Sequence, residues 1–282
     1  MGTMTGGIRV AYQGEPGAFS EGAARGMLGA GISGVPCRTF EEMFAAVVRG
    51  DAVCCVAPIE NSLAGSIHRN YDLLLETELT ISGETNVRIV HHLIAGSPVA
   101  VADLRRVYSH PVALAQCAKF LAAHPHVEAV PVHDTAGAVR MVVQGGRSDE
   151  AAIASAEAAA IHGGSILASG VEDDPQNFTR FLLMTRHEAP PLIETPRKWK
   201  TSIVFRLPNK PGSLFRALGA FALLDIDLAK IESRPVQGKP WEYSFYLDLI
   251  GASTEPHVVR ALDNLTNMAE MVKVLGSYPT RW

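Results

Sequence analysis

The first two thirds of the chain alternate short apolar runs with alanine-rich, periodically apolar stretches. Short apolar runs predict buried strands, and apolar residues spaced three or four apart predict helices. A predicted strand followed by a predicted helix recurs along this region, with the strands at residues 8–12, 52–59, 106–109, 129–132 and 151–155. This alternation indicates an α/β layer fold.

The periodic pattern of apolar residues is interrupted near residue 189. Residues 190–200 contain three prolines and little periodicity, so we place a domain linker there. Beyond it, the pattern predicts a small ferredoxin-like βαββαβ domain. Its expected elements are a strand at 201–208, a helix at 211–224 with Pro211 in its first turn, strands at 226–236 and 243–251, a helix at 255–269 and a strand at 271–279.

Composition and charge exclude several classes of protein. The 282 residues suit about two domains, and 47% hydrophobic with 19% charged residues is typical of a globular chain. The net charge is −4 and the sequence has no cluster of basic residues, so it shows no sign of binding nucleic acid through the phosphates. The four cysteines form no Cys-x-x-Cys pair, which favours buried free thiols. No apolar stretch or leader suggests a membrane span or secretion, so we expect a cytoplasmic protein.

Polar residues follow every predicted strand of the first region, where the next helix begins. The carboxyl ends of strands in an open α/β sheet meet helix N-termini, whose free N–H groups and dipoles favour small anions. Each junction alone equally fits ordinary helix capping, as Thr39 and Glu42 do in a capping box. Together they predict an anion-binding cleft without identifying its ligand.

Motifs for cofactors and metals do not fit the sequence. Residues 14–17 lack the spacing of a dinucleotide loop, and Pro16 removes an N–H donor from that turn. His91 and His92 are adjacent in a strand-like run, so they should face opposite sides and could not chelate one metal together. We therefore expect neither a cofactor nor a metal.

Several ordered blocks resemble one enzyme family. Residues 177–182 (NFTRFL) are similar to the Thr-Arg-Phe motif of prephenate dehydratases, and further blocks of that family match residues 12–24, 58–74, 108–117 and 134–139. Residues 209–214 (NKPGSL) and 232–235 (ESRP) resemble the phenylalanine-binding segments of ACT domains. The resemblance covers nearly the whole chain.

The resemblance implies a specific domain organisation. A two-lobed, periplasmic-binding-protein-like α/β catalytic domain would occupy residues 1–189, with lobes at 1–86 plus 180–189 and at 87–179. The linker at 190–200 would lead into an ACT regulatory domain at 201–282. No chorismate mutase is expected to be fused to the chain.

The reaction implied by the resemblance is a lyase step of phenylalanine biosynthesis. Prephenate loses carbon dioxide and hydroxide to give phenylpyruvate, and the departing hydroxyl accepts the electron pair, so no cofactor is needed. The enzyme must supply a proton donor, bind the carboxylates and remove water from the carboxylate that leaves.

The resemblance also assigns candidate site residues. Thr179 would donate a hydrogen bond or proton to the leaving hydroxyl; by strand propensity alone it would be an ordinary strand threonine. Arg180 would hold a carboxylate or steady the loop, and strand alternation, which points it away from Thr179, favours the second role. His110 is more readily a helix cap than a proton carrier. Phe181 and neutral donors would complete the substrate site: Asn61, Ser62, Ser66, Ser109 and Thr135.

For the ACT domain, the resemblance implies feedback inhibition by L-phenylalanine and a homodimer or homotetramer, because paired ACT domains share the effector site. The effector residues would be Asn209, Pro211, Gly212, Ser213, Leu214, Glu232, Ser233, Arg234 and Pro235. Ser213 and Phe215 stand where the family commonly has Ala and Val, which bears on the strength of binding.

Two other functions remain open at this stage. An arogenate dehydratase, acting on the aminated analogue, would carry the same blocks. A non-catalytic amino-acid sensor, built from a two-lobed binding module and an ACT domain, belongs to a different class; the intact Thr-Arg-Phe motif argues against it.

Overall fold

The computed structural model describes residues 7–187, 198–236, 238–239 and 241–280. The chain divides into two compact units: Met1–Leu73 with Thr85–Leu183, and Leu74–Glu84 with Met184–Trp282. Most of the linker predicted at 190–200 lies outside the described residues; 198–200 begin a strand. The segment 74–84, which we had assigned to the first catalytic lobe, groups with the C-terminal unit.

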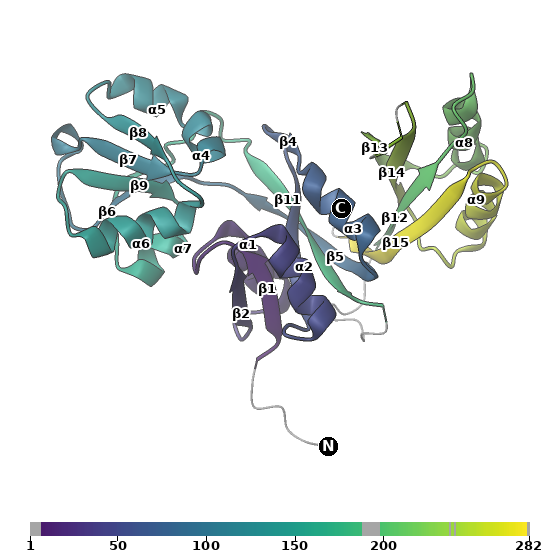
Figure 1. Cartoon of the computed structure of the whole chain (residues 1–282), viewed down its shortest axis with the longest axis horizontal. Coiled ribbons are helices and arrows are strands. Elements are labelled where there is room, and N and C mark those ends of the chain that lie inside the picture. Colours follow the sequence, from purple (N-terminus) through teal and green to yellow (C-terminus); the bar gives the residue numbers. More distant parts are fainter. Residues whose placement is uncertain (1–6, 188–197, 237, 240, 281–282) are drawn as a thin grey trace, which may run out of the picture. The chain divides into compact units, whose positions relative to one another are not determined.

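The first sheet has the strand order β2-β1-β3-β11-β5, with β4 paired to β3 (Figure 1). Its strands are β1 (Arg9–Gln13), β2 (Ser33–Cys37), β3 (Cys54–Asn61), β4 (Gly65–Ser66), β5 (Leu79–Arg88) and β11 (Phe178–Arg186). Because β1 runs parallel to β3, the two strands end at the same edge of the sheet, with polar residues at both ends.

Three helices accompany this sheet: α1 (Phe19–Leu28), α2 (Phe40–Arg49) and α3 (His68–Glu76). Helix α2 begins because the Thr39 hydroxyl accepts a hydrogen bond from the Glu42 N–H at 3.2 Å, as the capping box predicts. The Glu42 carboxylate, however, accepts from the N–H of Arg38 at 2.8 Å, one residue before the N-cap. This contact fixes the backbone that enters α2.

The second sheet has the order β10-β6-β9-β7-β8. Its strands are β6 (His92–Ala95), β7 (Arg106–Ser109), β8 (Glu128–Pro131), β9 (Glu150–Ala154) and β10 (Ser165–Ser169). With it lie the 3-10 turn η1 (Val101–Asp103) and helices α4 (Pro111–Gln116), α5 (Ala118–Ala123), α6 (Thr135–Gly145) and α7 (Ala156–His162). Gly163 ends α7 in the left-handed conformation, which glycine adopts readily.

The pattern of residues 111–123 predicts one helix, but the structure has two, with a break at Cys117. The backbone N–H of Asp173 donates to the Gln116 carbonyl at 2.7 Å, and the Asp173 carboxylate accepts from the Lys119 N–H at 2.9 Å. Because Asp173 takes groups that a continuous helix would use internally, α4 stops at Gln116.

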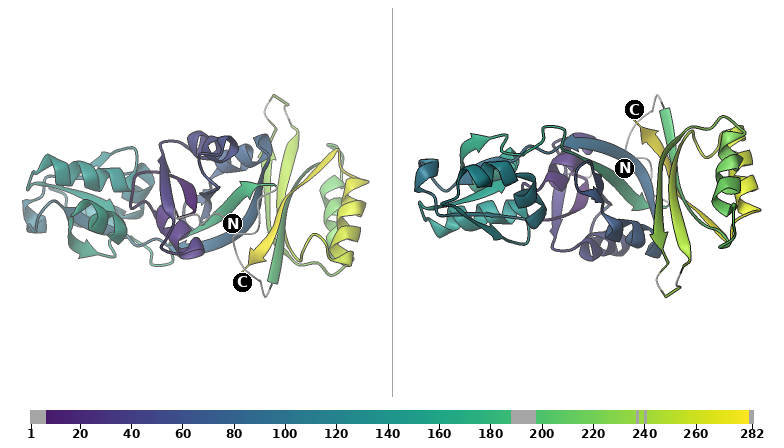
Figure 2. Two further views of the ribbon diagram at one scale, coloured as in Figure 1. Left: turned by 90° about the horizontal axis from the view of Figure 1, so that it is seen from below. Right: turned by 90° about the horizontal axis from the view of Figure 1, so that it is seen from above.

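The third sheet and its two helices form the predicted ferredoxin-like domain. It has the order β13-β14-β12-β15, with neighbouring strands antiparallel. Figure 2 shows both helices on one face of the sheet. The elements are β12 (Lys198–Arg206), α8 (Ser213–Ala222), β13 (Leu228–Pro235), β14 (Tyr243–Ile250), α9 (Pro256–Thr266) and β15 (Met271–Thr280). Helix α8 begins at Ser213 with Gly212 as its N-cap, so placing Pro211 in the first helical turn was wrong.

The segment 74–84 packs against β12 and β15 within the second unit. The Lys273 ammonium donates to three carbonyls at the end of α3, of which Thr77 is the nearest at 3.0 Å. A Cβ at Gly276 would lie 2.2 Å from the Ile81 carbonyl oxygen, so only glycine fits there. Cations favour helix C-termini, and the glycine allows close backbone approach. These contacts explain why 74–84 belongs to this unit.

The predicted fold class is confirmed: two α/β sheets are followed by a ferredoxin-like βαββαβ domain. All four cysteines are buried and free, as expected. Within the described ranges, none of the helices combines the length and apolar character needed to cross a membrane.

Candidate active site

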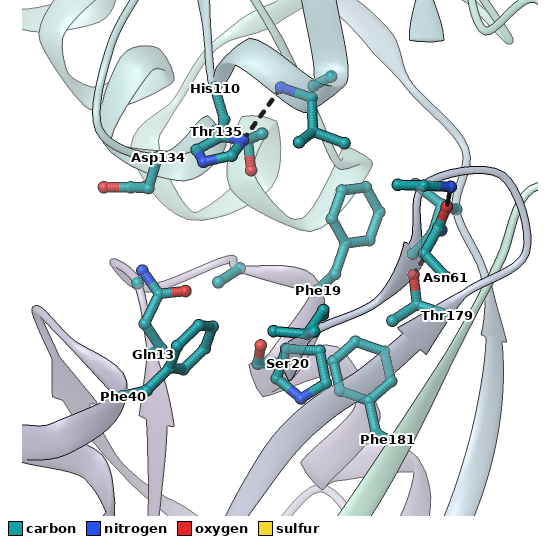
Figure 3. A pocket seen from close by; sticks show the side chains of 18 of the residues that line it. Gln13, Phe19, Ser20, Phe40, Asn61, His110, Asp134, Thr135, Thr179 and Phe181 are labelled. Atoms are coloured by element: carbon teal, nitrogen blue, oxygen red, sulfur yellow. Dashed lines mark hydrogen bonds between the residues drawn. The ribbon is translucent and has the colours of Figure 1, made fainter. Parts of the chain in front are cut away.

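A cavity of about 620 Å³ opens between the two sheets of the first unit. Residues at the starts of several helices line it, including Phe19 and Ser20 of α1, Phe40 of α2 and Thr135 of α6 (Figure 3). The gathering of helix N-termini around one cavity agrees with the predicted anion-binding cleft.

Thr179 lies near the start of β11 and is 7% exposed. The Nδ2 of Asn61, at the end of β3, donates to the Thr179 hydroxyl at 2.9 Å (Figure 3). Within the described part of the chain, the Thr179 hydroxyl donates to no acceptor. A hydroxyl that accepts a hydrogen bond becomes a better donor, because hydrogen bonds in a chain polarise one another. The Thr179 proton is therefore available to a molecule in the cavity.

Backbone groups fix the orientation of the Asn61 amide. Its Oδ1 accepts hydrogen bonds from the N–H groups of Leu63 at 3.0 Å and Ala64 at 2.8 Å. Because a backbone N–H can only donate, this side of the amide must be the oxygen. The Nδ2 therefore faces Thr179, and the direction of their hydrogen bond is not arbitrary.

The same logic fixes two more amides. Asn61 Nδ2 also donates to Asn177 Oδ1 at 2.7 Å, so Asn177 presents its Nδ2 to Gln116 Oε1 at 3.0 Å. Gln116 Nε2 then returns a hydrogen bond to Asn61 Oδ1 at 3.2 Å. Asn177 is fully buried. This closed ring of three amides holds Asn61 rigidly beneath Thr179.

His91 extends this network. Its Nε2 lies 3.0 Å from Gln116 Oε1, and since that oxygen can only accept, Nε2 must carry the hydrogen. Burial lowers the pKa of His91. In the neutral ring, Nδ1 is then an acceptor, and it has no hydrogen-bond partner among the described residues. His91 also lines the cavity.

The structure brings some of the predicted substrate residues to the cavity but not others. Asn61, Ser66, Thr135, Thr179 and Phe181 all line it. His110, at the start of α4, lines it too, and its Nδ1 accepts from the Val112 N–H at 3.2 Å, as a cap would. Burial and, to a smaller extent, the nearby His133 lower the pKa of His110.

Ser62 and Ser109 are not in the cavity lining, and their hydroxyls are occupied elsewhere. Ser62 Oγ donates to the Gln176 carbonyl at 2.8 Å and accepts from the Phe178 N–H at 2.9 Å. Ser109 is fully buried and donates to the Ile153 carbonyl at 2.6 Å. Because both hydroxyls bond to backbone, the structure does not support the predicted role of Ser62 and Ser109 as substrate donors.

Arg180 is half-buried and does not line the cavity, whereas its neighbours Thr179 and Phe181 do. This is the alternation expected of a strand. A direct contact between Arg180 and a carboxylate in the cavity is therefore not supported, and its role in steadying the segment around Thr179 stays a prediction.

Sequence reasoning missed several residues of the site. Gln116 and Asn177 lay inside the family blocks but carried no pattern of their own, and His91 was set aside with the other histidines. Their separation in sequence from Asn61 hid the amide ring. Gln13, Ser20 and Arg38 also line the cavity.

The predicted effector residues fall in three places in the second unit. Asn209 and Pro211 precede α8; Gly212, Ser213 and Leu214 form its N-cap and first turn. The other four residues, Glu232–Pro235, end β13, which is an edge strand of the third sheet. Gly212 has φ 76°, a conformation that favours glycine.

Comparisons with known proteins bear on this site. The chain matches the prephenate dehydratase family over residues 10–189 and the ACT domain family over residues 201–267. A curated relative from Arabidopsis thaliana, arogenate dehydratase/prephenate dehydratase 2, chloroplastic, is 46% identical over 281 residues, covering 96% of this chain and 73% of the relative.

Two solved structures are similar over nearly the whole chain. Prephenate dehydratase from Arthrobacter aurescens, in complex with L-Phe, has a TM-score of 0.87 at 33% identity, covering 97% of this chain and 90% of that one. GqqA, described as a novel type of quorum quenching acylase, has a TM-score of 0.87 at 37% identity, covering 96% and 98%.

Proposed function

Because the chain belongs to the prephenate dehydratase family and carries a C-terminal ACT domain, we propose that it converts prephenate to phenylpyruvate. The observation that carries this proposal is the Thr179 hydroxyl, held by the Asn61 amide with its proton free toward the cavity.

In the proposed reaction, the bond between the ring and its carboxylate breaks, and its electrons pass through the ring to expel the hydroxyl at the opposite ring carbon. Carbon dioxide leaves, the ring becomes aromatic, and the hydroxide takes up one proton to become water. The Thr179 O–H stabilises the charge that develops on the departing oxygen. Because Asn61 donates to Thr179, the donor is already oriented before the substrate binds.

The apolar part of the cavity supports the decarboxylation. Phe19, Phe40, Ile89 and Phe181 line it beside the polar groups. A carboxylate loses its charge as carbon dioxide departs, so removing water from it raises the substrate's energy more than the transition state's. The mixed lining thus suits a reaction in which one carboxylate is destroyed.

The same geometry does not favour an acylase, the activity described for GqqA. A hydroxyl nucleophile needs a neighbouring base to take its proton. The polar neighbour of the Thr179 hydroxyl is the Asn61 Nδ2, which donates and cannot accept a proton. Thr179 is therefore better placed to donate than to attack.

The experiment that tests the proposed reaction is turnover of prephenate by the full chain without added cofactor. We expect phenylpyruvate and carbon dioxide in equal amounts. An absence of phenylpyruvate, under conditions where the chain is folded, would overturn the proposal.

Arogenate is the alternative substrate, and the name of the Arabidopsis relative includes both activities. Arogenate differs from prephenate only in its side chain, which carries an ammonium in place of the keto oxygen. The leaving groups on the ring are the same, so Thr179 would serve either substrate. The choice between them depends on the part of the cavity that receives the side chain.

We also propose that L-phenylalanine inhibits the enzyme through the ACT domain. The support is the match to the ACT family and a relative of known structure crystallised with L-Phe. Helix α8 has no side-chain cap, since its N-cap is Gly212, so N–H groups of its first turn remain available to a carboxylate.

Gly212→Ala is expected to weaken inhibition by L-phenylalanine while leaving turnover without effector unchanged. A residue with a Cβ at φ 76° is strained by about 1–2 kcal/mol, so the turn before α8 should shift. Titration of L-phenylalanine against initial rate and against binding heat measures both effects.

Gly219→Ala is the matched control, because it lies within α8, lacks a positive φ and has open space around its Cβ. It should keep the wild-type response. Full inhibition of Gly212→Ala would place the effector site elsewhere. Assembly into dimers or tetramers and a cytoplasmic location stay predictions from the sequence.

A further inference from the structure

The two ends of the proposed substrate's ring carry different groups. Its leaving hydroxyl stands at one end, and both carboxylate-bearing groups stand at the opposite end. If Thr179 receives the hydroxyl, the anionic end must lie across the cavity. Figure 3 shows Thr179 and Asn61 on one side of the cavity, with Gln13, Phe40 and Asp134 on the other.

Arg38 belongs to that far side. It lies two residues before Phe40, and its carbonyl accepts a hydrogen bond at 3.0 Å from His133, the neighbour of Asp134. Its own N–H donates to the Glu42 carboxylate at 2.8 Å. The Arg38 backbone is thus held from both lobes, while its side chain is exposed and lines the cavity.

Arg38 is the only lysine or arginine among the described residues that line this cavity. Its guanidinium makes no ion pair or hydrogen bond with any other described residue. The two acidic residues of the lining are already engaged: Glu41 pairs with Arg69 at 2.7 Å, and Asp134 caps α6 by accepting from the Gly137 N–H at 2.6 Å. Arg38 therefore supplies, on the far side of the cavity, a positive charge that no described carboxylate pairs with.

A cation suits only one of the two substrate carboxylates. The ring carboxylate disappears in the reaction, so an arginine bound to it would stabilise the substrate more than the transition state and slow the chemistry. The side-chain carboxylate keeps its charge throughout, so binding it costs no rate. An exposed arginine at the cavity rim can reach this carboxylate without bringing water to the ring carboxylate that is lost in the reaction.

We propose that Arg38 binds the side-chain carboxylate of the substrate and makes the enzyme prefer the 2-oxo acid prephenate to the amino acid arogenate. This inference rests on the proposed function. The carbon next to that carboxylate carries a neutral keto group in prephenate and an ammonium in arogenate. The guanidinium attracts the carboxylate of either substrate, but it repels the ammonium of arogenate at short range.

Arg38→Gln tests the proposal through the ratio of kcat/KM on the two substrates. A hydrogen bond to a charged group at a partly exposed site supports a loss of about tenfold in kcat/KM on prephenate. We expect the loss to appear as a higher KM with kcat unchanged, because the contact is equally strong in the substrate complex and in the transition state. Arogenate should be affected less, since attraction and repulsion are lost together.

Two further variants sharpen the test. Arg38→Glu should lower kcat/KM on prephenate further, and more than on arogenate, because its carboxylate repels the side-chain carboxylate of both substrates but attracts the ammonium of arogenate; the preference should move toward arogenate. Arg49→Gln is the control for net charge: Arg49 ends α2, pairs with Asp51 at 2.8 Å and does not line the cavity. It should leave the ratio unchanged. Added salt should raise the KM of the wild type for prephenate more than that of Arg38→Gln.

The possible outcomes distinguish a failure of the proposed function from a failure of the proposed role of Arg38. If the wild type turns over neither substrate, the proposed function fails. If the wild type makes phenylpyruvate but Arg38→Gln keeps the wild-type ratio, or shifts it no more than Arg49→Gln does, the proposed role of Arg38 fails while the function stands. A fall in kcat with unchanged KM would also contradict it.

Discussion

Replacing Thr179 with valine is expected to lower kcat on prephenate about 10²–10³-fold, the cost of losing one donor that stabilises a developing oxyanion. Valine keeps the branched shape, so packing around this buried position changes little. Asn61 Nδ2 keeps its hydrogen bonds to Asn177 Oδ1 and to the Phe178 carbonyl at 3.2 Å, so both of its hydrogens still have an acceptor. Because the lost contact strengthens in the transition state, kcat and kcat/KM should fall together.

Thr179→Ser is the conservative control, since it restores the hydroxyl without the methyl group. It should recover most of the activity lost in the valine variant. Circular dichroism and thermal unfolding should report the same fold for both variants. A valine variant with wild-type kcat would remove Thr179 from the proposed mechanism.

Replacing Glu84 with alanine is expected to destabilise the second unit by about 3–5 kcal/mol, the usual cost of removing one partner of a buried ion pair. Glu84 pairs with Lys200 at 2.6 Å, and their side chains are 2% and 9% exposed. Glu84 also accepts from the Thr280 hydroxyl at 2.7 Å. The alanine variant would leave the Lys200 ammonium buried without this carboxylate.

Tryptophan fluorescence during urea unfolding measures this effect selectively, because all three tryptophans of the sequence, at positions 199, 241 and 282, belong to the second unit. Glu84→Met combined with Lys200→Met should recover most of the lost stability, since an apolar pair needs no charge compensation. Glu242→Ala breaks the exposed pair with Lys239, which is also in the second unit, and should cost about 0–1 kcal/mol. An equal, small effect in Glu84→Ala and Glu242→Ala would refute the assignment.

The sequence predicted Thr179 and Asn61 as site residues, and both line the cavity, but it missed the residues that hold them in place. Asn61 and Thr179 were found because each falls in a recognisable block, and strand alternation correctly separated Thr179 and Phe181 from Arg180. The ring formed by Asn61, Asn177 and Gln116 could not be predicted, because it depends on which way side-chain amides turn in a folded core.

Polar residues at strand ends were an incomplete guide to the cavity. Ser62, Ser66 and Ser109 have the same chemistry, but only Ser66 lines the cavity; the hydroxyls of Ser62 and Ser109 bond to nearby backbone. The pattern of residue types cannot show whether a hydroxyl faces a ligand or satisfies a carbonyl. Arg38 was missed for a related reason: it lies before a helix rather than in a motif.

The structure divides the chain differently from the predicted domains. The resemblance placed residues 74–84 in the first catalytic lobe, and the family match over residues 10–189 includes them. The structure groups them with the third sheet through Lys273, Gly276 and the pair of Glu84 with Lys200. A truncation near Pro196 would remove all of these contacts, so full-length point variants are the better test of regulation.

The most direct test of the proposed function is the initial rate of the full chain on prephenate and on arogenate, measured in the same buffer with product identification. We expect a larger kcat/KM on prephenate, with one phenylpyruvate formed for each carbon dioxide released and no cofactor added. A much larger kcat/KM on arogenate would contradict the proposed substrate, and the absence of product from both would contradict the proposed reaction.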